Sequence, residues 1–113
     1  MIDAHGGGGF RFAGMSHRGS LICLPAGIWT WPVADVAALD EAAFAPIFAC
    51  AGDLDFFVLG TGAQPWAMPP ALRGRLRGAG LAVDVMTTGA AVRTYNVMLM
   101  EGRRVAAGLI AVG

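Results

Sequence analysis

The chain has 113 residues, of which 56% are hydrophobic and 14% are charged, against roughly 25% charged residues in an average soluble domain. This length predicts one domain over residues 1–113, and the low charge excludes an intrinsically disordered chain. Eight arginines balance eight acidic residues, lysine is absent and the formal net charge is zero. A nucleic-acid-binding domain needs a basic surface, so nucleic acid is excluded as the main partner.

The first third of the chain predicts a small β-meander. Residues 1–9 contain four consecutive glycines and are expected to form a flexible lead-in. Alternation of apolar and polar residues, followed by two apolar runs, is typical of short strands separated by glycine and proline turns. Strands are predicted over residues 10–12, 20–24 and 28–31, and turns over 14–19 and 25–27.

Helical and strand patterns alternate along the remainder of the chain. Helices are predicted over residues 40–51, from 69 to 78 or 80, and over 87–102, and strands over 54–59, 81–86 and 105–112. Pro46 lies inside the first of these helices and is expected to kink it unless the helix begins nearer to it. Asp40 has the residue type that favours an N-cap.

This element order predicts an α/β fold with three layers, in which helices cover both faces of a central sheet. The sheet should be mixed, because strands joined by hairpins are antiparallel while strands joined through a helix are parallel. Residues 105–112 contain neither a polar residue nor proline, which places that strand in the middle of the sheet.

The mean hydropathy of +0.59 raises the question of a membrane segment. A spanning helix needs about 20 consecutive apolar residues, and the longest uncharged stretch, residues 56–72, is broken by two glycines and three prolines. The N-terminus has neither a basic start nor an apolar run, so no signal peptide is predicted. We therefore expect a cytoplasmic protein without a transmembrane segment.

The residue types used most often in covalent and metal chemistry are few in this chain. Cys23 and Cys50 lie in apolar runs and are expected to be reduced core thiols, with a disulfide or metal role as the alternative. His5 and His17 lack the spacing of zinc ligands. Ser16 precedes His17 directly, and consecutive side chains rarely face each other as a catalytic dyad must. No catalytic residue, metal or other cofactor is predicted.

Two segments rich in glycine and threonine each follow a predicted strand. If the two strands are parallel neighbours, both segments lie at the sheet edge where open α/β sheets bind ligands, and the N–H groups that open the following helix favour an anion. An arginine early in that helix can pair with a carboxylate or phosphate. The candidate ligand-binding residues are Gly60, Thr61, Gly62, Thr87, Thr88, Arg93 and Asn96. The alternative is that the glycines serve turn geometry, Thr88 caps the helix and Arg93 is solvated.

Three tryptophans, Trp29, Trp31 and Trp66, lie in short strands or loops. An exposed group of aromatic residues marks a partner-binding surface. These three residues are therefore the candidate partner-binding residues. Burial of all three in the core is the alternative.

Several blocks of the sequence resemble the Mth938-like family, also called DUF498. The resemblance covers Phe10 to Val112, and the blocks that carry it are Phe10–Phe12, Ser16–Ser20, Trp31-Pro32, Gly60–Gly62, Met86–Ala91 and Arg93–Asn96. It implies a three-layer α/β fold with a mixed sheet, and it implies no established enzymatic activity. The family includes the mitochondrial complex I assembly factor 3, as well as bacterial proteins that are often encoded near membrane components of protein export.

The resemblance therefore implies a bacterial, non-enzymatic interaction module that assists the assembly of a membrane or respiratory complex. Its partner would be an unidentified protein, through which the chain associates peripherally with a membrane. The alternative function is a small domain or minor enzyme that binds an anionic ligand in the crevice between the Gly60–Gly62 loop and the Thr88 helix N-terminus.

Overall fold

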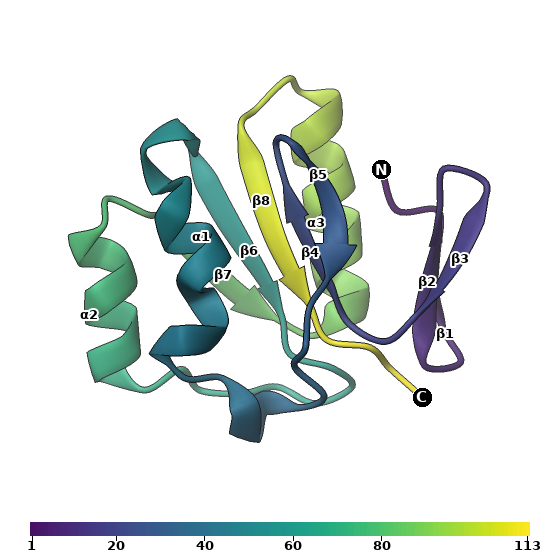
Figure 1. Ribbon diagram of the computed structural model, residues 1–113, viewed down its shortest axis with the longest axis horizontal. Coiled ribbons are helices and arrows are strands. Elements are labelled where there is room, and N and C mark those ends of the chain that lie inside the picture. Colours follow the sequence, from purple (N-terminus) through teal and green to yellow (C-terminus); the bar gives the residue numbers. More distant parts are fainter.

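The computed structural model describes residues 1–113 as an α/β fold with two sheets (Figure 1). The strands are β1 (Ala4–Gly6), β2 (Gly9–Phe12), β3 (Met15–Arg18), β4 (Leu21–Leu24), β5 (Gly27–Thr30), β6 (Phe56–Gly60), β7 (Val83–Met86) and β8 (Val105–Leu109). The helices are α1 (Ala45–Ala49), α2 (Pro70–Gly78) and α3 (Thr88–Met100), with 3₁₀ turns η1 (Val36–Ala38), η2 (Glu41–Phe44) and η3 (Ala51–Asp53).

The larger sheet has the strand order β5-β4-β8-β6-β7. Strand β4 pairs antiparallel with both β5 and β8, whereas β6 pairs parallel with both β7 and β8. The predicted mixed sheet is confirmed. The prediction that the last strand lies in its middle is also confirmed, and all five residues of β8 are buried.

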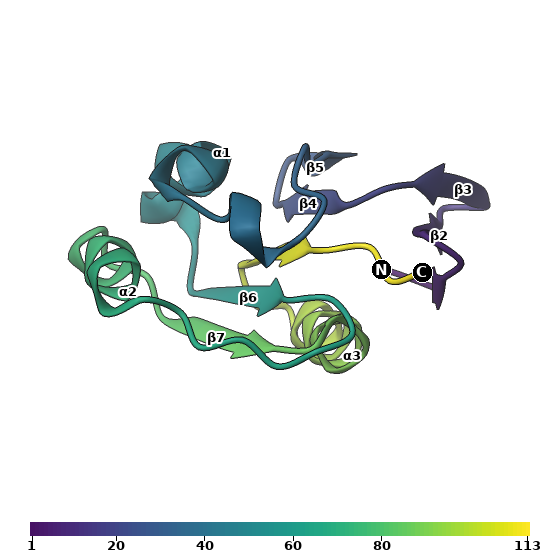
Figure 2. The same ribbon diagram turned by 90° about the horizontal axis from the view of Figure 1, so that it is seen from below.

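Helices cover this sheet on both sides, which confirms the three layers. Alternate residues of β6 point to opposite faces: Phe57 and Leu59 pack under α1 and α2, and Val58 packs under α3. Figure 2 shows α1 and α3 on opposite sides of the sheet. The last predicted helix, α3, is buried against the sheet at Ala91, Val92 and Tyr95.

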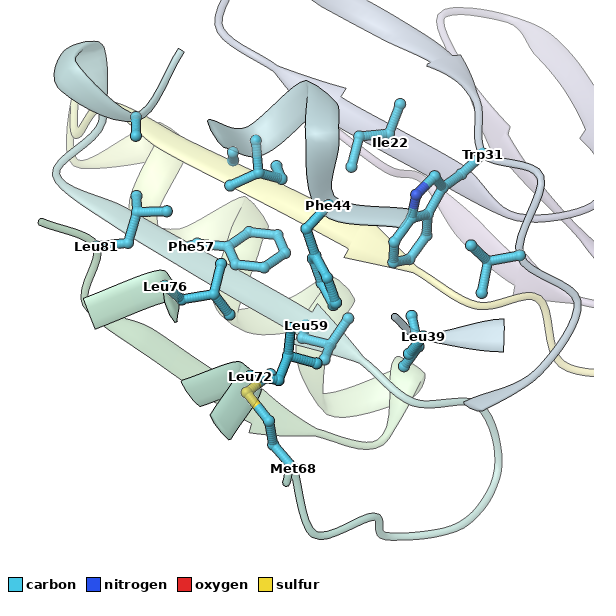
Figure 3. Packing of buried hydrophobic residues seen from close by; sticks show 14 of the residues in the cluster. Ile22, Trp31, Leu39, Phe44, Phe57, Leu59, Met68, Leu72, Leu76 and Leu81 are labelled. Atoms are coloured by element: carbon cyan, nitrogen blue, oxygen red, sulfur yellow. The ribbon is translucent and has the colours of Figure 1, made fainter. Parts of the chain in front are cut away.

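The core on the α1 and α2 face is built around three aromatic rings (Figure 3). Phe44 lies between Trp31 and Phe57, with both pairs of ring centroids 5.9 Å apart in edge-to-face arrangements. Such edge-to-face pairs bring the positive ring edge onto the negative ring face. All three rings are buried.

The N-terminal residues form a second, three-stranded antiparallel sheet in the order β1-β2-β3. The prediction that residues 1–9 are a flexible lead-in is wrong: Ile2 is buried and Ala4–Gly6 is a strand. Gly7 and Gly8 have φ values of 60° and 82°, and positive φ at both loop residues is what a two-residue type I′ hairpin requires. The glycine run is therefore a turn that joins two strands.

The predicted turn over residues 14–19 is also wrong, because Met15–Arg18 is strand β3. A second two-residue loop, Ala13-Gly14, joins it to β2, again with positive φ at both positions. The predicted helix over 40–51 is divided into η2, α1 and η3. Pro46 lies in the first turn of α1, the position where its missing N–H costs no hydrogen bond. Asp40 caps η2 by accepting a hydrogen bond from the Ala43 N–H at 2.9 Å.

None of the helices has both the length and the apolar character needed to cross a membrane. The longest, α3, has 13 residues.

Candidate functional site

The two threonine- and glycine-rich segments do lie side by side at the carboxyl ends of β6 and β7. The Thr61 N–H donates to the Met86 carbonyl at 2.9 Å, and the Thr88 N–H donates to the Gly62 carbonyl at 2.9 Å. The hydroxyl of Thr88 accepts from the Gly62 N–H at 2.8 Å and donates to the Ile110 carbonyl at 2.7 Å. The hydroxyl of Thr61 donates to the Gln64 carbonyl at 2.8 Å.

These hydrogen bonds hold the two segments in direct contact. Gly60, Thr61, Gly62 and Thr88 are all buried, and a Cβ added to Gly60 would lie 2.9 Å from the Thr88 Cα. The Thr61 and Thr88 hydroxyls thus have partners within the chain, and Gly60 permits close contact between β6 and α3. Thr87 is half-buried, and its side chain makes no capping hydrogen bond. A ligand role for these residues stays a prediction.

Asn96 lies on α3 and holds the N-terminal backbone. Its Nδ2 donates to the Ile2 carbonyl at 2.7 Å, and its Oδ1 accepts from the Ile2 N–H at 2.8 Å. This pair of bonds ties the N-terminal sheet to the body of the fold. Arg93, one turn earlier on α3, is exposed, and its side chain lies near Gly89, as does that of His5.

The three tryptophans occupy three different environments. Trp31 is 3% exposed, and its Nε1 donates to the Ala43 carbonyl at 2.8 Å. Its ring packs so closely on Gly108 that a Cβ there would lie 2.7 Å away. Trp66 is half-buried against the same core. Trp29 is 49% exposed. The predicted partner surface of all three residues is therefore corrected: Trp31 is a core residue, and Trp29 is the tryptophan on the surface.

Neither cysteine has the environment of a reactive thiol. Burial raises the pKa of Cys23 from 9.0 to about 12, and burial together with the nearby Asp53 raises the pKa of Cys50. The thiolate is the nucleophilic form, so a raised pKa leaves both groups protonated and unreactive near neutral pH. Both thiols are free. No group of three or more His, Cys, Asp or Glu side chains is placed to hold a metal ion.

A pocket of about 460 Å³ lies on the N-terminal sheet, where sequence reasoning placed no site. It is lined by Ala4, His5, Gly6, Gly7, Gly9, Phe10, Arg11, Ser16, His17 and Arg18. The signal in the sequence is the glycine run of residues 6–9, followed closely by Arg11 and Arg18. The interpretation of residues 1–9 as a flexible lead-in concealed it.

Comparison with known proteins places the chain among relatives that match nearly its full length. An uncharacterized protein of Rhodobacter capsulatus is 39% identical over 96% of this chain and 82% of the relative. The mouse NADH dehydrogenase [ubiquinone] 1 alpha subcomplex assembly factor 3 is 29% identical over 96% of this chain. The chain spans 59% of the length of that assembly factor.

Solved structures share the fold. A structure described as an outer membrane protein from Bartonella henselae superposes with a TM-score of 0.94 at 43% identity, covering 99% of this chain and 94% of that one. A Bordetella pertussis protein described as a Mth938-like domain has a TM-score of 0.81 at 23% identity, covering 96% of this chain and 84% of that one. The second likeness shows the fold alone.

The family resemblance carried by the sequence blocks is confirmed. A family model described as a protein of unknown function, DUF498/DUF598, matches residues 2–110, and the chain belongs to that family.

Proposed function

We propose that the chain is an interaction module that binds a protein partner and assists the assembly of a membrane or respiratory complex. Its likeness over 96% of its length to a mouse complex I assembly factor supports this role. We further propose that it acts in the cytoplasm and associates with a membrane peripherally, through that partner.

The observation that carries the proposal is the exposed Trp29 on an uncharged edge strand. Strand β5 is an edge strand of the larger sheet and pairs only with β4. Edge strands present unpaired N–H and C=O groups, and proteins usually protect them with charged residues. The opposite edge strand, β7, carries the exposed Asp84, whereas β5 consists of Gly27, Ile28, Trp29 and Thr30.

An edge of this kind can accept a strand from another chain, with backbone hydrogen bonds for affinity and side-chain contacts for specificity. Tryptophan is among the residues that contribute most to protein interfaces when a partner covers them. Trp29 leans over Gly27, whose missing side chain leaves room for the indole ring. The proposed interface is therefore β5, with Trp29 as its main contact.

Affinity purification of the tagged chain from its native cells tests this proposal. The three chains to compare are the wild type, Trp29→Ala and the control Val97→Ala, because Val97 on α3 is also 49% exposed. We expect Trp29→Ala to reduce recovery of the membrane-complex subunits at least tenfold, which corresponds to about 1.4 kcal/mol. Val97→Ala should leave recovery unchanged.

A second variant separates the strand edge from the indole ring. Thr30→Lys keeps Trp29 and adds to β5 the charge that protects natural edge strands, so it should also reduce recovery. Thermal unfolding of each purified variant checks that the fold is intact. Equal recovery of the same subunits with wild type, Trp29→Ala and Thr30→Lys would overturn the proposal.

A further inference from the structure

The pocket on the N-terminal sheet owes its shape to small residues. Two rows of paired residues cross the three strands: Ala4, Arg11 and Ser16 form one, and Gly6, Gly9 and Arg18 form the other. The rows are two positions apart along each strand, so they share one face of the sheet. Ala4, Gly6 and Gly9 leave this face hollow, with Arg11, Ser16 and Arg18 beside the hollow.

Only glycine fits at position 9. A Cβ added there would lie 2.1 Å from the His17 carbonyl oxygen, a distance that no real side chain tolerates. The close approach of β2 to β3 therefore depends on glycine. The hollow is built into the backbone.

The charged residues that line the pocket are all basic. Two of the chain's eight arginines are among the ten lining residues, and none of the ten is acidic. Elsewhere Arg75, Arg103 and Arg104 pair with carboxylates. Arg11 and Arg18 make no side-chain hydrogen bond or ion pair. In a chain of zero net charge, this is a local concentration of unpaired cations.

The two arginines are also placed to act on one group. Arg11 pairs with Ser16 and Gly9 pairs with Arg18, so Arg11 and Arg18 are diagonal neighbours on adjacent strands, about 7–8 Å apart at the backbone. Their long side chains can converge on a single anion across that separation. Each guanidinium presents a planar fork of donors that matches a carboxylate or phosphate.

A third polar side chain on this face lacks a partner, whereas His5 and His17 belong to the intervening row, which the pleat turns to the other face of the sheet. The hydroxyl of Ser16 forms no hydrogen bond within the chain and adds another donor. The volume of about 460 Å³ lies within the range of small-molecule sites.

We propose that this pocket binds the oxyanion group of a small molecule, a phosphate or a carboxylate, through Arg11 and Arg18. Ser16 provides a further hydrogen bond to the same ligand. The site includes neither strand β5 nor Trp29. A failure of the proposed interface at β5 would therefore leave this proposal unaffected.

Nuclear magnetic resonance titration of the purified chain tests the proposal in a buffer free of phosphate and carboxylate. The probes are inorganic phosphate, pyrophosphate and citrate, with glycerol as an uncharged control. We expect saturable shifts of the backbone amides of residues 4–18 with the anions, and none with glycerol. Tighter binding of the phosphates assigns a phosphate-bearing ligand, and tighter binding of citrate assigns a carboxylate.

Variants then test the residues. The double variant Arg11→Gln with Arg18→Gln should weaken the tightest anion at least tenfold, whereas Arg77→Gln, an exposed arginine on α2 without an ion pair, should change it less than twofold. Ala4→Glu should also weaken it, because a carboxylate opposite Arg11 would compete with the ligand. Shifts that do not saturate, or an equal loss in Arg77→Gln, would overturn the proposal.

Discussion

The two sheets of this protein are stabilised in different ways. In the five-stranded sheet, β8 is fully buried and β6 nearly so, and apolar side chains pack on both faces. In the three-stranded sheet, β1 and most of β3 are exposed, and the turns depend on glycine. Stability therefore resides in the layered body, and the N-terminal sheet is free to carry polar groups that a core would exclude.

The small sheet is attached to the body at a few points. Ile2 and Phe10 contribute apolar side chains to the α3 face of the core. Asn96 holds the Ile2 backbone, and the Gly8 N–H donates to the Val112 carbonyl at 2.7 Å. The contrast predicts that mutations in the body lower global stability, whereas mutations at these attachments loosen one sheet and leave the other intact.

The largest effect should come from Phe44→Ala. This change removes the central ring of the aromatic core and leaves a cavity, so the free energy of unfolding should fall by about 3–5 kcal/mol. Urea denaturation measures the loss. Met100→Ala, at a position that is 70% exposed, should change it by less than about 0.5 kcal/mol. A loss below about 1 kcal/mol for Phe44→Ala would contradict the assignment of stability to the body.

A smaller and local effect is expected from Asn96→Ala. The Ile2 N–H and C=O lose their partners in a half-buried setting, which costs about 1–3 kcal/mol. Amide hydrogen exchange should accelerate about tenfold or more in β1 and β2 while β6 and β8 keep their protection. Thr94→Ala, two residues away on α3, is the control. Equal acceleration in both sheets would show that they unfold as one unit.

The third effect is confined to alkaline pH and to the α3 face of the body. Burial raises the pKa of Cys23 from 9.0 to about 12, and burial also raises the pKa of Tyr95. Above pH 9 the unfolded chain loses the thiol proton while the folded chain keeps it, so stability is present below pH 9 and falls as pH rises toward 12. Tyr95 adds to the decline above pH 10, its ordinary pKa.

Cys23→Ala removes the thiol from this balance. Urea denaturation at several pH values between 9 and 11 should give a shallower decline for the variant than for the wild type. Its absolute stability can change for packing reasons, so the slope is the quantity to compare. Parallel declines would show that the buried thiol does not contribute.

The body of the fold was predictable because its signals are local. The apolar run at 105–112 predicted the central strand, and alternating helix and strand patterns predicted the layers. Strand β2 was predicted, but β1 was missed because a glycine run has the same composition in a linker and in a type I′ turn. What separates the two is the pairing of flanking residues such as Ala4 and Arg11, which composition does not contain.

The candidate site was harder to predict because it depends on contacts distant in sequence. Trp31 is buried because Gly108 leaves room for its ring. The Thr88 hydroxyl is already hydrogen-bonded to Gly62 and Ile110. Proximity of the two threonine-rich segments followed from the pattern of strands. The tightness of their packing did not, since it depends on the small volume of Gly60 against α3.

The place of β8 in the larger sheet makes folding depend on a late pairing step. Strands β4 and β5 form one pair and β6 and β7 another, and β8 alone joins them. It is also the last strand in chain order. During folding the two pairs cannot join into one sheet until residues 105–109 lie between them. Joining them closes contacts far apart in sequence, which is a slow step in folding.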